Sequence, residues 1–67
     1  MEIKIHTETI ELAQAIKRAD WVQSGGEAKW LVQQGEVTVN GEVDTRRGRK
    51  LRPGDRVAFD GNELIIT

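Results

Sequence analysis

The spacing of the hydrophobic residues changes at Gly35, and this change limits the folds open to the chain. Before Gly35, apolar residues recur at helical spacing in residues 10–19 and 25–34, which predicts two amphipathic helices. After Gly35 they alternate with polar residues, a pattern typical of half-buried strands. A short alternating segment, residues 1–6, predicts one more strand before the helices. This order predicts an α+β fold, with a two-helix hairpin packed on a small, mostly antiparallel β-sheet.

Capping residues mark the ends of both predicted helices. Ser24 and Glu27 have the spacing of a capping box, in which each side chain bonds a backbone amide of the first turn. Gly35 suits a left-handed residue just after the second helix. Thr7 and Thr9 are both candidate N-caps for the first helix.

Turn residues separate the predicted strands that follow Gly35. Asn40–Gly41 favours a tight hairpin, because both residues tolerate a positive φ angle. Residues 51–55 contain Pro-Gly at the central positions of a type II turn. Strands are expected at 56–59 and 63–66, joined by a tight turn at 60–62.

The length of 67 residues predicts a single domain over residues 1–67. No apolar run is long enough for a membrane span, and no signal-peptide pattern is visible, so no membrane partner is expected. The chain has no cysteine, which is typical of a reducing compartment, and we therefore expect a cytoplasmic protein.

The net charge of −1 conceals an uneven distribution of charge along the chain. Residues 1–44 hold eight acidic and four basic residues, whereas residues 45–56 hold six basic residues and one acidic residue. Five of the six are arginines, whose planar, forked guanidinium suits phosphate oxygens and stacks on bases. The segment therefore predicts binding of an anion rather than a merely solvated loop. Its basic residues are Arg46, Arg47, Arg49, Lys50, Arg52 and Arg56.

No group of residues predicts catalysis. His6 is the single histidine and there is no cysteine, so a metal site lacks ligands. Ser24 is explained by helix capping, and no base stands near it in the sequence. The acidic residues are scattered. We expect neither enzymatic activity nor a cofactor.

Two features near the second helix leave alternatives open. Gly25 and Gly26 lower helix stability, and either a tight loop entry or close approach of a phosphate to the helix N-terminus would explain them. Trp30 projects away from the predicted apolar stripe of the helix. It either packs on a neighbouring loop, or forms a stacking surface for a base or an anchor for a protein partner. Trp21 is expected to cap one end of the core.

Three segments of the chain resemble a known family. Residues 24–32 read SGGEAKWLV, residues 35–42 read GEVTVNGE and residues 51–57 read LRPGDRV. In this order and spacing they are similar to the S4 domain, the RNA-binding domain of the type found in ribosomal small-subunit protein S4. The likeness covers about residues 8–60, and it is strongest to the small stand-alone bacterial YbcJ/YaaA-like branch.

The resemblance implies a compact helix–helix–sheet module, the alpha-L motif, that binds structured ribosomal or transfer RNA. It also implies that Lys17, Arg18 and Lys29 on the two helices face the RNA. Many members have basic residues where this chain has Gly25 and Gly26. Residues 46–52, within the arginine-rich segment (residues 45–56), would supply that charge here.

The resulting hypothesis is a non-catalytic, single-domain RNA-binding protein that associates with the ribosome. The alternative is a protein-interaction module that docks on an acidic surface of the translation machinery. The predicted RNA-binding residues are Arg46, Arg47, Arg49, Lys50, Arg52, Lys29, Lys17, Arg18, Gly25, Gly26 and Trp30.

Overall fold

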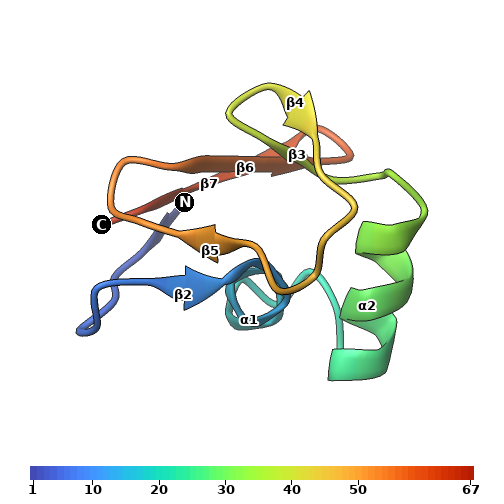
Figure 1. Ribbon diagram of the computed structural model, residues 1–67, viewed down its shortest axis with the longest axis horizontal. Helices are drawn as coiled ribbons and strands as arrows, with labels where there is room; N and C mark the ends of the chain where they lie inside the picture. Colours follow the sequence, from blue (N-terminus) through green and yellow to red (C-terminus); the bar gives the residue numbers. More distant parts are fainter.

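Two helices lie beneath a small β-sheet in the computed structural model, which describes residues 1–67 (Figure 1). The predicted α+β class, with a helix pair on a mostly antiparallel sheet, is confirmed. In chain order the elements are β1 (Glu2–Ile3), β2 (Ile10–Glu11), α1 (Leu12–Arg18), α2 (Gly25–Gln33), β3 (Thr38–Val39), β4 (Glu42–Val43), β5 (Lys50–Leu51), β6 (Arg56–Phe59) and β7 (Asn62–Ile66).

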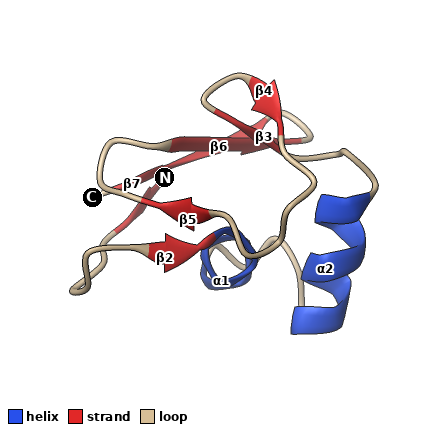
Figure 2. Ribbon diagram, viewed as in Figure 1, coloured by secondary structure: helices blue, strands red, loops and turns tan.

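The main sheet has the strand order β1-β7-β6-β3-β4, and β2 and β5 form a separate two-stranded ribbon (Figure 2). Only β1 and β7 are parallel, and they join the two ends of the chain. The pairing continues beyond β1, where the Ile5 amide donates to the Thr67 carbonyl at 3.0 Å. The expected first strand is thus confirmed, although its regular part is shorter than residues 1–6.

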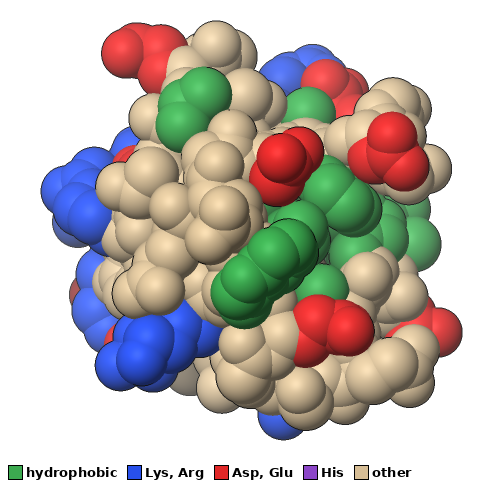
Figure 3. Space-filling view, turned by 90° about the vertical axis from the view of Figure 1, so that its right-hand side faces the viewer, with side chains coloured by type: hydrophobic (Ala, Val, Ile, Leu, Met, Phe, Trp, Pro, Cys, Tyr) green, Lys and Arg blue, Asp and Glu red, His purple; other side chains and the backbone are tan.

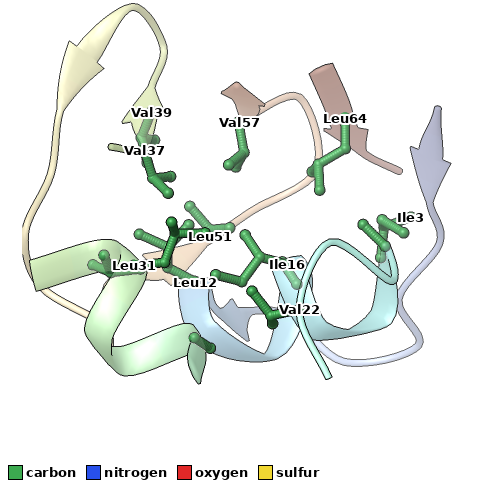
Figure 4. Close-up of a cluster of buried hydrophobic side chains, with 14 of the residues drawn as sticks. Ile3, Leu12, Ile16, Val22, Leu31, Val37, Val39, Leu51, Val57 and Leu64 are labelled. Atoms are coloured by element: carbon green, nitrogen blue, oxygen red, sulfur yellow. The ribbon is translucent and has the colours of Figure 1, made fainter. Parts of the chain in front are cut away.

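The apolar core lies between the main sheet and the helices (Figure 4). Alternation along β6 and β7 directs Val57, Leu64 and Ile66 into this core, where all three are buried. The other face of the same strands carries Arg56 and Glu63, which are exposed. The outer face also carries the half-buried Ala58 and Ile65, so it is mixed, whereas the inner face is apolar. The fifteen buried apolar residues are Ile3, Leu12, Ala15, Ile16, Ala19, Val22, Ala28, Leu31, Val32, Val37, Val39, Leu51, Val57, Leu64 and Ile66.

The start of α1 differs from the prediction. The helix begins at Leu12 rather than at residue 10, and its N-cap, Glu11, makes no side-chain capping bond. Thr7 and Thr9 are therefore not N-caps, and the Thr7 hydroxyl instead donates to the Thr9 carbonyl at 2.7 Å. The residues just before the helix are drawn into β2, because a distant segment pairs with them.

That distant segment is β5, which the sequence pattern did not predict. Ile10 pairs with Leu51, and Glu11 pairs with Lys50, in antiparallel register. Leu51 was expected to open a turn, but it is fully buried in the core. A two-residue strand is too short to give an alternating pattern, so the sequence carries no local sign of this pairing.

The remaining helix ends and turns agree with the capping and turn signals. The Ser24 Oγ accepts from the Glu27 amide at 3.2 Å, and Glu27 reaches back to accept from the Gln23 amide at 2.7 Å. Gly35 has a φ of 78°, as a left-handed residue after α2 requires. Asn40 and Gly41 have φ angles of 52° and 87°, which confirms the predicted hairpin between β3 and β4.

The two turns beside β6 are confirmed as well. Gly54 has a φ of 100°, and the Asp55 amide donates to the Arg52 carbonyl at 3.0 Å, as expected of a type II turn. Asp60 and Gly61 have φ angles of 50° and 79° and join β6 to β7.

Candidate nucleic-acid interface

The arginine-rich segment is held against the start of α1 by its own backbone. The Leu12 amide donates to the Arg49 carbonyl at 2.8 Å, and the Ala13 amide donates to the Arg47 carbonyl at 3.0 Å. These amides belong to the first turn of a helix, which has no internal partner for them. The segment thus replaces the missing side-chain cap, and Figure 1 shows it descending from β4 past α1 to β5.

Asp44 organises the first part of this segment, and it is the one charged residue buried in the fold. Its Oδ1 accepts from the Arg46 amide at 2.9 Å and from the Arg46 Nε at 3.1 Å. Its Oδ2 accepts from the Arg46 Nη2 at 2.9 Å and from the Arg49 Nη1 at 2.7 Å. In the charge pattern of the sequence, Asp44 is only one acid of an acidic half. Its place two residues before Arg46 is an Asx-turn spacing that could have revealed this role.

Hydrogen bonds lower the pKa of two carboxyl groups, those of Asp44 and Asp55. The Arg46 side chain, by its hydrogen bonds to Asp44, holds the pKa of that carboxyl well below its usual range. The Asp44 carboxylate in turn raises the pKa of the Arg46 guanidinium. Burial alone would raise the pKa of Asp55, but hydrogen bonds from the Arg52 amide and the Asn40 side chain lower it. Asp44 and Asp55 are therefore charged at neutral pH.

Two further basic residues of the segment form exposed ion pairs. Lys50 Nζ lies 3.2 Å from Glu11 Oε2, across the β2–β5 ribbon. Arg56 Nη1 lies 3.0 Å from Glu63 Oε1, on the face of the sheet that is turned away from the core. Arg56 thus stands apart from the rest of the segment, although it follows it directly in the sequence.

Six basic residues have no ion-pair partner within the chain: Lys4, Arg18 and the four that follow. Arg47 and Arg52 come from the arginine-rich segment, Lys17 from α1 and Lys29 from α2, and all four are exposed. Arg18 is also free of carboxylates, but its Nη2 donates to the Lys4 carbonyl at 2.9 Å. We call Arg47, Arg52, Lys17 and Lys29 the unpaired set.

A shallow hollow of about 340 Å³ brings the arginine-rich segment next to both helices. Arg47 and Gly25 both border it, although 22 positions separate them in the sequence. Lys29 lies one turn beyond Gly25 on α2, and Lys17 lies one turn beyond Gln14, which also borders the hollow. The lining residues are Glu11, Ala13, Gln14, Gly25, Arg47 and Gly48.

The surface around α2 is mixed in charge (Figure 3). In this view from the side of α2, most of the visible Lys and Arg side chains gather along the left edge, whereas Asp and Glu are scattered over the rest. A concentration of positive charge at one side can persist in a chain of net charge −1, because screening limits each charge to its surroundings.

Gly25 and Gly26 have no structural need to be glycine. Both lie in the first turn of α2 without a positive φ angle. A Cβ added to Gly25 would meet no atom within 4 Å, and one added to Gly26 would meet only the Ser24 Oγ, at 3.9 Å. The tight-entry explanation is therefore not supported by the local geometry.

The two tryptophans have different environments. Trp30 is 60% exposed on the outer side of α2, as the helical geometry predicts. Trp21 is half-buried against the core, and its ring centroid lies 6.1 Å from that of Phe59. Trp21 thus covers one end of the core, as expected, while Trp30 makes no aromatic contact.

No other constellation of reactive groups is present. His6 is exposed, and no three His, Cys, Asp or Glu residues come together as metal ligands would. Ser24 is engaged in the helix cap. Neither helix has the length and apolar character needed to cross a membrane.

Comparison with known proteins shows which family the chain resembles. The family model described as the S4 domain matches residues 3–67. The chain is 56% identical over 59 residues to the probable ribosome maturation protein RlbA of Bacillus subtilis, covering 88% of this chain and 83% of that protein. It is 36% identical over 57 residues to the putative RNA-binding protein YbcJ of Escherichia coli, covering 85% and 81%.

A solved structure agrees with the sequence relatives. The solution structure of YbcJ from Escherichia coli, described as having an alpha-L motif involved in RNA binding, superimposes with a TM-score of 0.75. The sequence identity is 30%, and the match covers 98% of this chain and 85% of that one. The helix pair and sheet are therefore arranged alike in the two proteins.

Proposed function

The chain belongs to the S4 domain family, and from that premise we propose that it binds structured ribosomal or transfer RNA without catalysing a reaction. The names of two relatives support this proposal, since one is a probable ribosome maturation protein and the other a putative RNA-binding protein. We also propose that the protein associates with the ribosome and is therefore located in the cytoplasm.

The observation that carries the proposal is the clamp between the arginine-rich segment and α1. Two backbone hydrogen bonds, to the carbonyls of Arg47 and Arg49, fix the segment beside the starts of both helices. A long exposed arginine on a free loop would lose more conformational entropy on binding than one on a fixed backbone. The clamp therefore favours a surface prepared for a rigid, charged partner.

Each part of this surface has a proposed role. The unpaired set contacts phosphates, because these four residues have no carboxylate to satisfy them. Gly25 and Gly26 let a phosphate approach the backbone amides at the start of α2. Trp30 offers an exposed ring on which a base can stack. The ion-paired bases Arg46, Arg49 and Lys50, together with Arg18, already have partners within the chain and contribute less to phosphate binding.

Salt dependence of RNA binding tests the proposal. If the unpaired set neutralises four phosphates, a plot of log K against log salt has a slope of about −2.8 to −3.6. The measurement is a filter-binding or fluorescence titration with purified ribosomal RNA and with transfer RNA at several salt concentrations. A slope near zero would contradict binding through phosphates.

The same protein can be used in a pull-down from cell extract, with and without ribonuclease. The proposal predicts that ribosomal RNA is recovered and that ribosomal proteins are lost after nuclease treatment. Partner proteins that survive the nuclease would instead support a protein-docking module.

A further inference from the structure

A second hollow, of about 350 Å³, is lined by Asp44 and by both of its arginine partners. It is formed by the end of β3, by β4 and by the turn that follows β4. This is the lower end of the size range of small-ligand sites. We call it the β4 hollow. Its lining residues are Val39, Asn40, Glu42, Val43, Asp44, Thr45, Arg46 and Arg49.

Asp44 holds the two arginines of this hollow in fixed positions. Each guanidinium has five N–H groups, of which Arg46 uses two on the Asp44 carboxylate and Arg49 uses one. The Asp44 side chain is only 6% exposed and accepts four hydrogen bonds, so its own capacity is filled. The remaining N–H groups of both arginines are donors without an acceptor inside the chain.

Two other groups of the hollow are also free. The Glu42 carboxylate and the Thr45 hydroxyl are exposed and make no hydrogen bond within the chain. Asn40, by contrast, donates to Asp55 and accepts from the Arg56 amide. The hollow therefore presents guanidinium donors and a carboxylate acceptor at the same time.

The formal charges in the hollow cancel. Arg46 and Arg49 are balanced by Glu42 and Asp44, so the hollow has no excess of positive charge for a phosphate. A neutral ligand with an acceptor edge and a donor edge fits these groups better. Val43, which is 60% exposed, adds an apolar surface against which a flat ring can lie.

Among the nucleobases, guanine combines these two edges. Its O6 and N7 atoms accept a bidentate pair of hydrogen bonds from a guanidinium. Its N1–H and N2–H groups stand side by side, and a carboxylate accepts from both. Uracil and cytosine lack the side-by-side pair of ring N–H and amino N–H donors that a carboxylate can take together. Adenine lacks two adjacent acceptors for an arginine fork.

We propose that the β4 hollow binds an unpaired guanine base of the RNA, with Arg46 or Arg49 on the O6/N7 edge and Glu42 on the N1/N2 edge. Proteins that recognise RNA by sequence take up such splayed-out bases from loops and bulges. This inference rests on the proposed RNA binding, and it assigns to the ion-paired arginines the selection of a base rather than the binding of phosphates.

The test is an NMR titration of the ¹⁵N-labelled protein with the four nucleoside 5′-monophosphates and with inorganic phosphate. The expected result is that guanosine monophosphate shifts the amides of Val43, Thr45 and Arg46, with a Kd on the order of 1–10 mM. The other nucleotides and phosphate should move these amides far less. Equal shifts with all nucleotides, shifts reproduced by phosphate, or no shift at about 20 mM would overturn the proposal.

A variant pair makes the test specific to the hollow. Glu42→Gln should weaken guanosine monophosphate binding at least about fivefold, because an amide accepts from one N–H and repels the other. Glu36→Gln, at an exposed glutamate outside the hollow, is the matched control and should leave binding unchanged. Equal effects of the two variants would also overturn the assignment. Failure of the guanine site would leave the salt-dependent RNA binding above intact, so the two proposals fail separately.

Discussion

Arg46 and Arg47 are neighbours in the sequence and both are exposed, but only Arg46 is paired with a carboxylate. The Arg46 guanidinium is fixed on a buried carboxylate, whereas the Arg47 side chain is exposed and has no ion-pair partner. The same contrast separates Arg49 from Arg52. A block of positive charge in a sequence thus divides into arginines held by a carboxylate within the fold and arginines left unpaired. The burial of one aspartate, Asp44, decides between the two roles.

The largest effect is expected from removing Asp44. Asp44→Ala leaves two guanidiniums without their carboxylate and removes the acceptor of the Arg46 amide. Because Arg46 is 71% exposed and Arg49 30% exposed, water replaces part of this loss, and the free energy of unfolding should fall by about 2–3 kcal/mol. Urea denaturation measures the change.

The matched comparison is Glu63→Ala, which breaks the exposed pair with Arg56. It should change the free energy of unfolding by less than about 0.5 kcal/mol. Equal changes in the two variants would contradict the distinction between ion pairs on a buried carboxylate and ion pairs on an exposed one.

The Asp44 carboxylate should also make the free energy of unfolding depend on pH in the acid range. A pKa that is lower in the folded chain than in the unfolded chain stabilises the fold at pH values above about 4. This stabilisation is lost as the pH falls below about 4 toward the lower pKa of the folded state. The free energy of unfolding should therefore be steady near neutrality and fall in acid. In Asp44→Asn that fall should be clearly smaller, and an unchanged acid profile would show that other carboxyl groups cause it.

Two glycines at opposite ends of α2 allow a second comparison between fold and binding. Gly35→Ala introduces a Cβ at a φ of 78° and should cost about 1 kcal/mol of stability. Gly25→Ala introduces one into open space within a helix and should add about 0.5–1 kcal/mol. If a phosphate approaches this turn, Gly25→Ala should also weaken RNA binding. Thermal unfolding and RNA titration of both variants separate these effects.

As small an effect on stability as that of Glu63→Ala is expected at Trp30. Because this side chain is 60% exposed and lies outside the core, Trp30→Ala should change the free energy of unfolding by less than about 0.5 kcal/mol. Because the stacking of a base on the indole ring would be lost, RNA affinity should fall about fivefold, which corresponds to about 1 kcal/mol. A large loss of stability would instead indicate that Trp30 packs structurally.

Local signals in the sequence predicted most of the fold. The hairpin at Asn40–Gly41, the type II turn at Gly54 and the capping box at Ser24 each depend on residues within four positions of one another. Their conformations are set by backbone sterics and by hydrogen bonds to adjacent amides. The sequence could therefore predict them without knowledge of the tertiary structure.

Long-range contacts account for what the sequence did not predict. The cap of α1 comes from the carbonyls of Arg47 and Arg49, more than thirty residues away, and a backbone carbonyl leaves no signature in side-chain types. The β2–β5 ribbon has two residues in each strand, too few for a period. The charge pattern located the candidate site, but only burial showed that Asp44 neutralises part of it.

The most direct test of the account compares charge reversal at Arg47 and at Arg56. Both residues belong to the same basic segment and are exposed, but Arg56 is paired with Glu63 on the sheet face away from the core. RNA affinity at one fixed salt concentration is measured for Arg47→Glu and for Arg56→Glu. The account predicts a loss of about tenfold for Arg47→Glu and less than about twofold for Arg56→Glu. Equal losses, or a larger loss at Arg56, would show that net charge rather than the clamped surface binds the RNA.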